Sequence, residues 1–265
     1  MRAVGLHADV VVAVSRAYRT TCTLVRSGAE AFCIDSPVFP DELEILPAIA
    51  EQSGFGVVGL LATHGDWDHL LGQYAFPEAP LGCAETTAAV LVGQPGRAQR
   101  ELRDFDEELY VERPRPLRLG SHPPAQSLPV PGHCGIGELE LELHPADGHT
   151  EDGMAIWVPW ARVLVCGDYL SPVEIPMISP GGSASAYLAT LARLEPLVEQ
   201  AEYVVPGHGE PLESTRAAAI LREDRAYLQA LLETGAEAKL PLARRSGEQR
   251  RIHAENAARV DPAAA

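Results

Sequence analysis

The chain has 265 residues, 46% of them hydrophobic, which is enough to bury the core of one large domain or two small ones. Its formal net charge of −16 disfavours nucleic acid as a partner, because phosphate binding needs a basic surface. No apolar run approaches the roughly 18 residues that span a membrane, so we expect no membrane partner.

The first elements are predicted to be strands and a helix. Residues 20–26 and 31–35 are typical of two strands joined by a Gly-containing turn, which indicates a hairpin. Residues 41–52 have the apolar spacing of a helix, and Asp41 can cap it. The apolar run 57–62 predicts a buried strand.

The loop that follows this strand concentrates potential metal ligands. Within Thr-His-Gly-Asp-Trp-Asp-His they are His64, Asp66, Asp68 and His69. Sites in α/β proteins usually lie on such a loop, at the C-terminal end of a strand. Histidine and aspartate supply nitrogen and oxygen donors for Zn²⁺ or harder transition metals. The alternative is a solvated loop with capping aspartates, and the density of ligand types argues against it. A helix is predicted to open directly after His69.

The middle of the chain is predicted to add material beside this loop. Residues 85–112 look helical, and we interpret residues 85–135 as an insertion at the mouth of the site. An outer-layer helix without substrate contact is an alternative of equal weight. The Pro-rich residues 114–131 are interpreted as a loop with a short strand at 117–119.

Three further candidate ligands follow in similar settings. Each of His149, Asp168 and His208 comes after a strand-like run and directly after a glycine. Glycine lets the backbone approach a site because no side chain is in the way. One such triplet carries little weight, but three in order after the first cluster predict one common site. His133 also follows a Pro-Gly pair, but it lies in the Pro-rich loop and ranks below His208.

The remaining elements complete one domain, residues 1–240. Strands are predicted at 139–143, 154–158 and 163–166, the last two as a hairpin, and helices at 183–199, capped by Ser183 or Ser185, and 213–233. Residues 241–265 are polar and are expected to form a C-terminal tail whose end frays.

In this order the motifs resemble the metallo-β-lactamase-fold hydrolases, whose signature is H-x-H-x-D-H followed by separate His, Asp and His motifs. The resemblance covers roughly residues 20–210 and implies an α/β fold, a four-layer αββα sandwich with metals at one edge of the sheets. A supporting aspartate usually ends an N-terminal strand, and here it is Asp35. The chain departs from the signature at Asp66, where the family carries a second histidine.

The resemblance implies two divalent metal ions. Two sets of side chains would each hold one ion: His64, Asp66 and His149 the first, and Asp68, His69 and His208 the second. Asp168 would bridge both ions, and Asp35 would orient a ligand from outside. A bridging hydroxide would be the nucleophile, because two cations lower the pKa of water toward neutrality. Asp68 and Asp168 are therefore the expected catalytic residues.

Asp66 changes the charge of this centre. Three aspartates and one hydroxide would balance two divalent ions, whereas histidine at position 66 would leave one positive charge. Oxygen in place of nitrogen also favours harder metals. We expect zinc first, with iron or manganese as the alternatives. Flavodiiron proteins resemble this arrangement with a glutamate, but their flavodoxin domain has no counterpart here.

The expected function is metal-dependent hydrolysis of a small-molecule ester, thioester or lactone, by resemblance to the glyoxalase II-like and lactonase branches. A phosphodiesterase is the second choice and a diiron redox enzyme the third. Competence-type nucleases also carry aspartate at this place, but the acidic charge fits DNA poorly. A non-catalytic metal-binding module is weakened because all seven ligand positions hold competent ligands.

Cysteine usage and the N-terminus bear on location. The five cysteines form no C-x-x-C pair, and an odd, scattered set argues against a disulfide framework. The apolar block 10–14 is too short for a signal peptide. We therefore expect a cytoplasmic protein.

Overall fold

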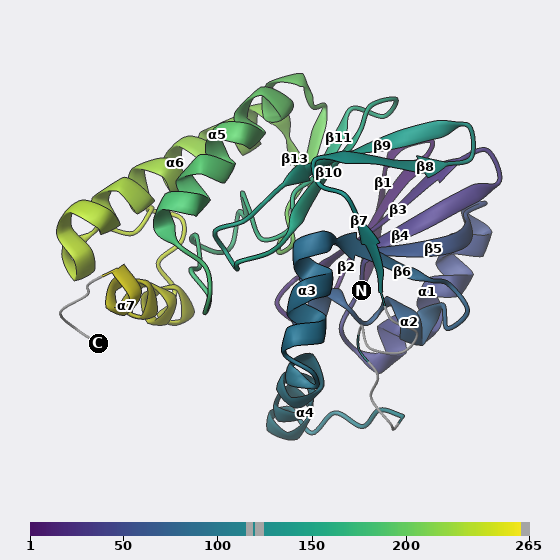
Figure 1. The fold of residues 1–265 in the computed structure, drawn as a ribbon, viewed down its shortest axis with the longest axis horizontal. Helices are drawn as coiled ribbons and strands as arrows, with labels where there is room; N and C mark the ends of the chain where they lie inside the picture. The colour runs from purple at the N-terminus through teal and green to yellow at the C-terminus, as the bar shows by residue number, and fades with distance from the viewer. Residues whose placement is uncertain (115–118, 120–124, 261–265) are drawn as a thin grey trace.

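The computed structural model describes residues 1–114, 119 and 125–260. Two β-sheets pack face to face, and helices cover their outer faces (Figure 1). This is the four-layer αββα sandwich predicted from the sequence. Most of the predicted strand at 117–119 lies outside the described residues. No helix in the described part of the chain is long and apolar enough to cross a membrane.

The first sheet follows the order of the chain. Its seven strands are β1 (Arg2–His7), β2 (Val10–Val14), β3 (Thr21–Ser27), β4 (Glu30–Asp35), β5 (Gly56–Ala62), β6 (Leu81–Ala84) and β7 (Gln126–Leu128). Strands β1 to β4 pair antiparallel, and β4 to β7 pair parallel. The predicted hairpin is β3 and β4, and the predicted buried strand is β5.

The second sheet has six strands in the order β13-β12-β11-β10-β9-β8. They are β8 (Gly132–Ile136), β9 (Leu139–Pro145), β10 (Met154–Val158), β11 (Val163–Val165), β12 (Tyr203–Val205) and β13 (Leu212–Glu213). The predicted hairpin is β10 and β11, which pair antiparallel, while β11 and β12 run parallel. His133 lies on β8 and not in a loop, so that part of the prediction was wrong.

Three apolar clusters lie between the layers and pack them together. One lies between the sheets and includes Val12, Ile34 and Ile156. A second packs the first sheet against its helices α1 (Pro40–Gln52), α2 (Gly72–Ala75), α3 (Glu85–Gly93) and α4 (Arg97–Glu108). The third packs the second sheet against α5 (Ala184–Gln200), α6 (Ser214–Thr234) and α7 (Gly247–Val260).

The helix starts follow local hydrogen bonding. Ser183 caps α5 as predicted, because its hydroxyl accepts a hydrogen bond from the Ala186 amide at 3.1 Å. The start of α1 differs from the prediction, since Glu42 and not Asp41 accepts the Phe39 amide at 3.2 Å. The predicted helix after His69 is reduced to a 3₁₀ turn at Trp67–His69 and the single turn of α2.

The C-terminal segment corrects one expectation. Residues 247–260 of the predicted tail form helix α7, which packs in the same cluster as α5 and α6. Its sequence is mostly polar, yet Ile252 and Ala257 are buried and the polar Asn256 has no exposed surface. Polar side chains that bond to a neighbouring backbone explain why an apolar pattern did not show this helix. Residues 261–265 lie outside the described part.

Candidate metal centre

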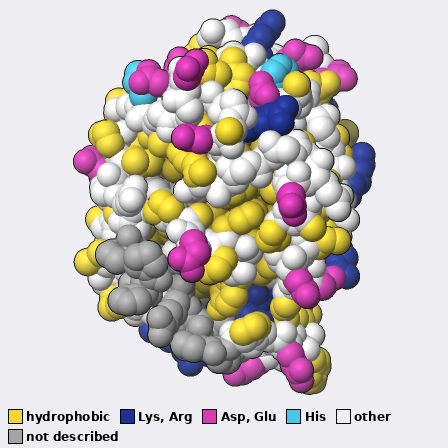
Figure 2. Space-filling model, turned by 90° about the vertical axis from the view of Figure 1, so that its right-hand side faces the viewer, with side chains coloured by type: hydrophobic (Ala, Val, Ile, Leu, Met, Phe, Trp, Pro, Cys, Tyr) yellow, Lys and Arg dark blue, Asp and Glu magenta, His cyan; other side chains and the backbone are white. Residues whose placement is uncertain are grey.

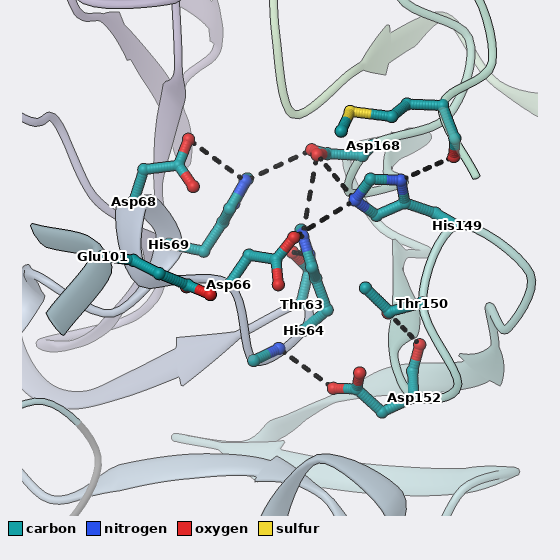
Figure 3. A network of polar contacts seen from close by, with 12 residues as sticks. Thr63, His64, Asp66, Asp68, His69, Glu101, His149, Thr150, Asp152 and Asp168 are labelled. Atoms are coloured by element: carbon teal, nitrogen blue, oxygen red, sulfur yellow. Dashed lines mark hydrogen bonds and ion pairs between the residues drawn. The ribbon is translucent and has the colours of Figure 1, made fainter. Parts of the chain in front are cut away.

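The predicted ligands meet at one edge of the two sheets. His64 to His69 follow β5, His149 follows β9, Asp168 follows β11 and His208 follows β12. Figure 3 shows the side chains of His64, Asp66, Asp68, His69, His149 and Asp168 directed toward one another. Ligand atoms converge to within 4.8 Å in three overlapping groups: His64, Asp66, His149; His64, His69, Asp168; and Asp68, His69, His208.

The first and third groups match the two sets that the resemblance implies. In the first, Asp66 Oδ2 lies 3.4 Å from His149 Nε2 and 3.7 Å from His64 Nε2. In the other, Asp68 Oδ2 lies 3.7 Å from His208 Nε2 and 3.8 Å from His69 Nε2. These spacings let two nitrogens and one oxygen surround a common point in each group.

Asp168 lies between the two groups. Its Oδ2 is 3.3 Å from His149 Nε2 and 3.2 Å from His208 Nε2, and its Oδ1 is 3.2 Å from His69 Nε2. The neighbouring Gly207 explains the glycine in the last triplet. A Cβ atom there would lie 2.0 Å from Asp168 Oδ1, so any side chain at this position would displace the carboxylate.

Each histidine presents Nε2 to the centre because its Nδ1 faces an acceptor behind it. Nδ1 of His149 lies 2.8 Å from the Met177 carbonyl oxygen, and Nδ1 of His208 lies 3.1 Å from that of Tyr18. The other two face side-chain oxygens: His64 Nδ1 lies 3.1 Å from Thr63 Oγ1, and His69 Nδ1 lies 3.0 Å from Asp35 Oδ2. Acceptors at Nδ1 favour the tautomer that leaves a lone pair on Nε2.

Asp35 has the outer position that the resemblance implies. Its carboxylate accepts the Thr63 amide at 2.8 Å and the Thr63 hydroxyl at 2.9 Å, besides facing His69. Its backbone φ is 56°, in the left-handed region that non-glycine residues seldom adopt. Strained backbone of this kind is characteristic of sites where a side chain must be held in one direction.

Burial and charge oppose one another at these groups. Burial lowers the pKa of His208, but the negative charges of Asp168 and Glu174 outweigh it and raise the pKa to about 10. Burial likewise lowers the pKa of His149, while the neighbouring carboxylates of Asp66 and Asp168 raise it to about 9. Burial raises the pKa of Asp168, and the surrounding histidines bring it well below its ordinary value. The carboxylates therefore attract positive charge to this edge.

A cavity of about 610 Å³ opens onto the centre. Besides the predicted ligands Asp66, Asp68, His149, Asp168 and His208, its lining comprises Tyr18, Trp67, Glu108, Leu109, Glu174, Met177, Glu248, Arg251 and Ile252. Glu108 and Leu109 lie at the end of α4, so the helical segment from the predicted insertion reaches the cavity. Leu102 and Phe105 of α4 pack in the apolar cluster beside the first sheet. Helix α7 also contributes to the lining.

Two further residues hold the loop after β5 and were missed in the sequence. Arg97 of α4 places a guanidinium nitrogen 3.4 Å from Asp66 Oδ1, which leaves Oδ2 facing the histidines. Asp152 accepts the Gly65 amide at 2.9 Å, as Figure 3 shows. No local pattern separates Arg97 from a surface arginine, because its role depends on how α4 packs. Asp152 had one usable signal, its position three residues after His149.

Two aromatic residues lie next to the site. Trp67 packs on Phe105 with ring centroids 4.8 Å apart, although it also lines the cavity. Tyr169 is buried, and its hydroxyl accepts the His149 amide at 3.1 Å.

A sequence model described as "Metallo-beta-lactamase superfamily" matches residues 16–208. This chain belongs to the metallo-beta-lactamase superfamily. The match covers all seven predicted ligands and ends at His208, so α6 and α7 lie beyond it.

Individual members of the superfamily have low sequence identity to this chain or match only part of it. Metallo-beta-lactamase type 2 of Bacteroides fragilis is 30% identical over 95 residues, which are 32% of this chain and 38% of that protein. A metallo-beta-lactamase family protein from Thermus thermophilus superposes with a TM-score of 0.67 at 19% identity, covering 95% of this chain and 92% of the other. The metallo-beta-lactamase from Pontibacter korlensis gives 0.58 at 17% identity, covering 83% and 98%. The two structures share the fold with this chain.

Proposed function

We propose that this protein is a dinuclear metal-dependent hydrolase that acts on a small-molecule ester, thioester or lactone. One observation carries the proposal. Four buried histidines turn Nε2 toward three aspartates, and each Nδ1 faces an acceptor behind it. Such a set of nitrogen and oxygen donors, oriented from outside, is what divalent transition metals require.

The buried atoms at the centre fit metal ions. Among the described residues, Nε2 of His64, His69 and His149 and Oδ1 of Asp168 are buried without a hydrogen-bond partner. Buried polar atoms in native proteins are nearly always satisfied, because leaving them unpaired costs free energy. A cation among these atoms would satisfy them together.

We assign the ligands as the resemblance implies. The first ion would be held by His64, Asp66 and His149, the second by Asp68, His69 and His208, with Asp168 between them. Zinc is our first choice, and Asp66 makes iron or manganese the alternatives. Arg97 supports this role for Asp66, since the contact at Oδ1 orients Oδ2 toward His149.

These residues would hold two divalent ions, which would supply the Lewis acidity that lowers the pKa of water and polarises the bond to be cleaved. The protein's own groups would position and transfer the proton. Asp68 lines the cavity, and its Oδ2 accepts the Thr20 hydroxyl at 3.2 Å. We propose that this carboxylate takes the proton of the attacking water and passes it to the leaving oxygen or sulfur. Asp168 would hold the histidines of both groups in place.

A small molecule fits the surroundings better than nucleic acid does. The chain carries a net charge of −16, and the face in Figure 2 shows Lys and Arg side chains scattered among acidic and apolar ones. The cavity volume of about 610 Å³ lies within the range typical of small-molecule sites. We also propose a cytoplasmic location, which the five free cysteines support.

Metal loading combined with a substrate panel tests the proposal. Protein purified without added metal is loaded with zinc, manganese or iron(II), and its metal content is measured. Turnover is then followed on esters, thioesters, lactones, a phosphodiester and, because of the Bacteroides relative's name, a β-lactam. We expect about two equivalents of metal and turnover of an acyl substrate.

Matched variants separate the site from its surroundings. Asp168→Asn removes the central carboxylate and should abolish turnover and the second equivalent. The control is Asp147→Asn, which makes the same change at an aspartate that pairs with Arg193 at the surface. It should change neither turnover nor the number of metal equivalents bound. Metal uptake without turnover on any substrate would favour a metal-binding module, and turnover of the phosphodiester alone would favour a phosphodiesterase.

A further inference from the structure

Residues 171–178, named here the 171–178 loop, connect the centre to α5 and contact two of the histidines. The Met177 carbonyl oxygen lies 2.8 Å from His149 Nδ1. At the other end, the Ser171 hydroxyl donates to the His208 carbonyl at 2.8 Å. The loop contains neither helix nor strand, so its own backbone hydrogen bonds do not fix its shape.

A single side chain of α7 holds this loop on both sides of Met177. Asn256 donates from Nδ2 to the Pro176 carbonyl at 2.7 Å, and its Oδ1 accepts the Ile178 amide at 2.8 Å. The side chain has no exposed surface, so water does not compete for these bonds. Both neighbours of Met177 are thereby fixed, and with them the direction of the Met177 carbonyl.

Two more side chains of the C-terminal segment bind the beginning of the loop. Gln249 Oε1 accepts the Ile175 amide at 2.7 Å. The buried guanidinium of Arg244 donates to the carbonyl of Glu174 at 2.7 Å, and Asp224 of α6 holds it through an ion pair at 2.6 Å. Side chains from residues 244–256 therefore fix the loop backbone along most of its length.

We propose that Asn256 is a positioning residue for His149, acting through the Met177 carbonyl, and that α7 is therefore part of the metal centre. The inference rests on the proposed metal-binding function. Asn256 lies beyond residue 208, where the match to the superfamily ends, so the superfamily match does not assign it this role. An acceptor at Nδ1 fixes both the tautomer and the ring orientation of a ligating histidine.

The experiment compares Asn256→Ala with Tyr227→Phe. The alanine variant removes both bonds to the loop. The Tyr227 hydroxyl accepts a hydrogen bond from Asn256 at 3.1 Å and contacts His253 at 3.0 Å, but it has no hydrogen bond to the loop. Tyr227→Phe therefore removes a buried polar contact in the same place while leaving the Pro176 and Ile178 bonds. Asn256→Ser, whose smaller hydroxyl leaves room for water, provides a milder change if the alanine variant does not fold.

Metal affinity and ligand geometry are the readouts. Competition with a chromogenic chelator gives the zinc dissociation constant of each equivalent, and cobalt(II) substitution gives a visible spectrum sensitive to the ligand set. We expect Asn256→Ala to weaken one of two equivalents by roughly 10- to 100-fold and to alter the cobalt spectrum. Tyr227→Phe should match the wild type in both.

The outcomes separate the two proposals. The positioning role is refuted if the wild type binds two equivalents of metal and both Asn256 variants keep its two affinities and its cobalt spectrum. Asn256 would then be only a structural residue, even if its substitution lowers the melting temperature. A wild type that takes up no metal would refute the proposed function and this role together.

Discussion

The substitution Asp35→Asn tests whether the outer carboxylate sets the tautomer of His69. Asp35 accepts two hydrogen bonds from Thr63 and lies 3.0 Å from His69 Nδ1. Asparagine keeps the shape of the side chain but replaces one acceptor oxygen by an NH₂ group. If Oδ1 stays on the Thr63 amide, NH₂ faces His69, and Nδ1 must accept. The ring proton then moves to Nε2, where the ligating lone pair is needed.

The magnitude follows from the loss of this outer partner. Substitutions of a residue that faces the outer nitrogen of a ligating histidine lower metal affinity by about 10- to 100-fold, which corresponds to roughly 1.4–2.7 kcal/mol. The metal-free protein should also lose about 1.5–3 kcal/mol of unfolding free energy, the usual worth of a hydrogen bond to a charged group, because an NH₂ group cannot accept the Thr63 hydroxyl. The expected signature is therefore a fall in stability together with weaker binding of the second metal.

The control is Glu42→Gln, which changes another buried carboxylate to an amide and whose partners Ser15 and Arg16 are not candidate ligands. Glu42 accepts the Ser15 hydroxyl at 2.6 Å and the Arg16 amide at 2.9 Å. It should lose stability without losing metal affinity. Both variants are measured by chelator competition and by denaturant unfolding of the metal-free protein. An Asp35→Asn protein with wild-type affinity for both equivalents would refute the tautomer argument.

Three further predictions follow from the same geometry. His208→Ala should bind one equivalent firmly, lose most turnover and keep the fold, which elemental analysis and circular dichroism check; unchanged turnover would remove His208 from the site. Asp66→His should raise the preference for zinc over manganese in a competition assay. It should also move the acidic limb of the pH–rate profile to lower pH, because one negative charge leaves the centre. A limb that stays in place would show that Asp66 does not set the pKa of the attacking water. The raised pKa values of His149 and His208, about 9 and about 10, stabilise the metal-free fold fully below the ordinary value of 6.5, and this stabilisation should disappear as pH rises through the folded values. Thermal unfolding of metal-free and zinc-loaded protein from about pH 6 to pH 10 measures this, and equal losses in both forms would contradict it.

The candidate ligands could be proposed from the sequence because each follows a strand and carries its own chemistry. Apolar runs ending in a polar residue, as at Asp168 and His208, predict strand ends, and parallel neighbours such as β11 and β12 bring those ends together. The order of the motifs then gave the fold by resemblance. Residues 57–62 and 154–158 were predictable as strands because they are apolar throughout.

The supporting residues could not be predicted, because their roles come from tertiary packing. Arg97 lies on a charged helix, and only the placement of α4 brings it to Asp66. Asn256 lies in a segment with few apolar residues, and its buried hydrogen bonds connect it to the backbone of residues 176–178. A pattern of hydrophobicity carries no information about such long-range polar contacts.

The most direct test of a dinuclear centre is anomalous-difference crystallography of zinc-loaded protein. We expect two peaks about 3.5–4 Å apart. One should lie among His64, Asp66 and His149, the other among Asp68, His69 and His208, with Asp168 between them. A single peak at saturating zinc, or an Asp66 carboxylate beyond bonding distance of both peaks, would contradict the dinuclear assignment.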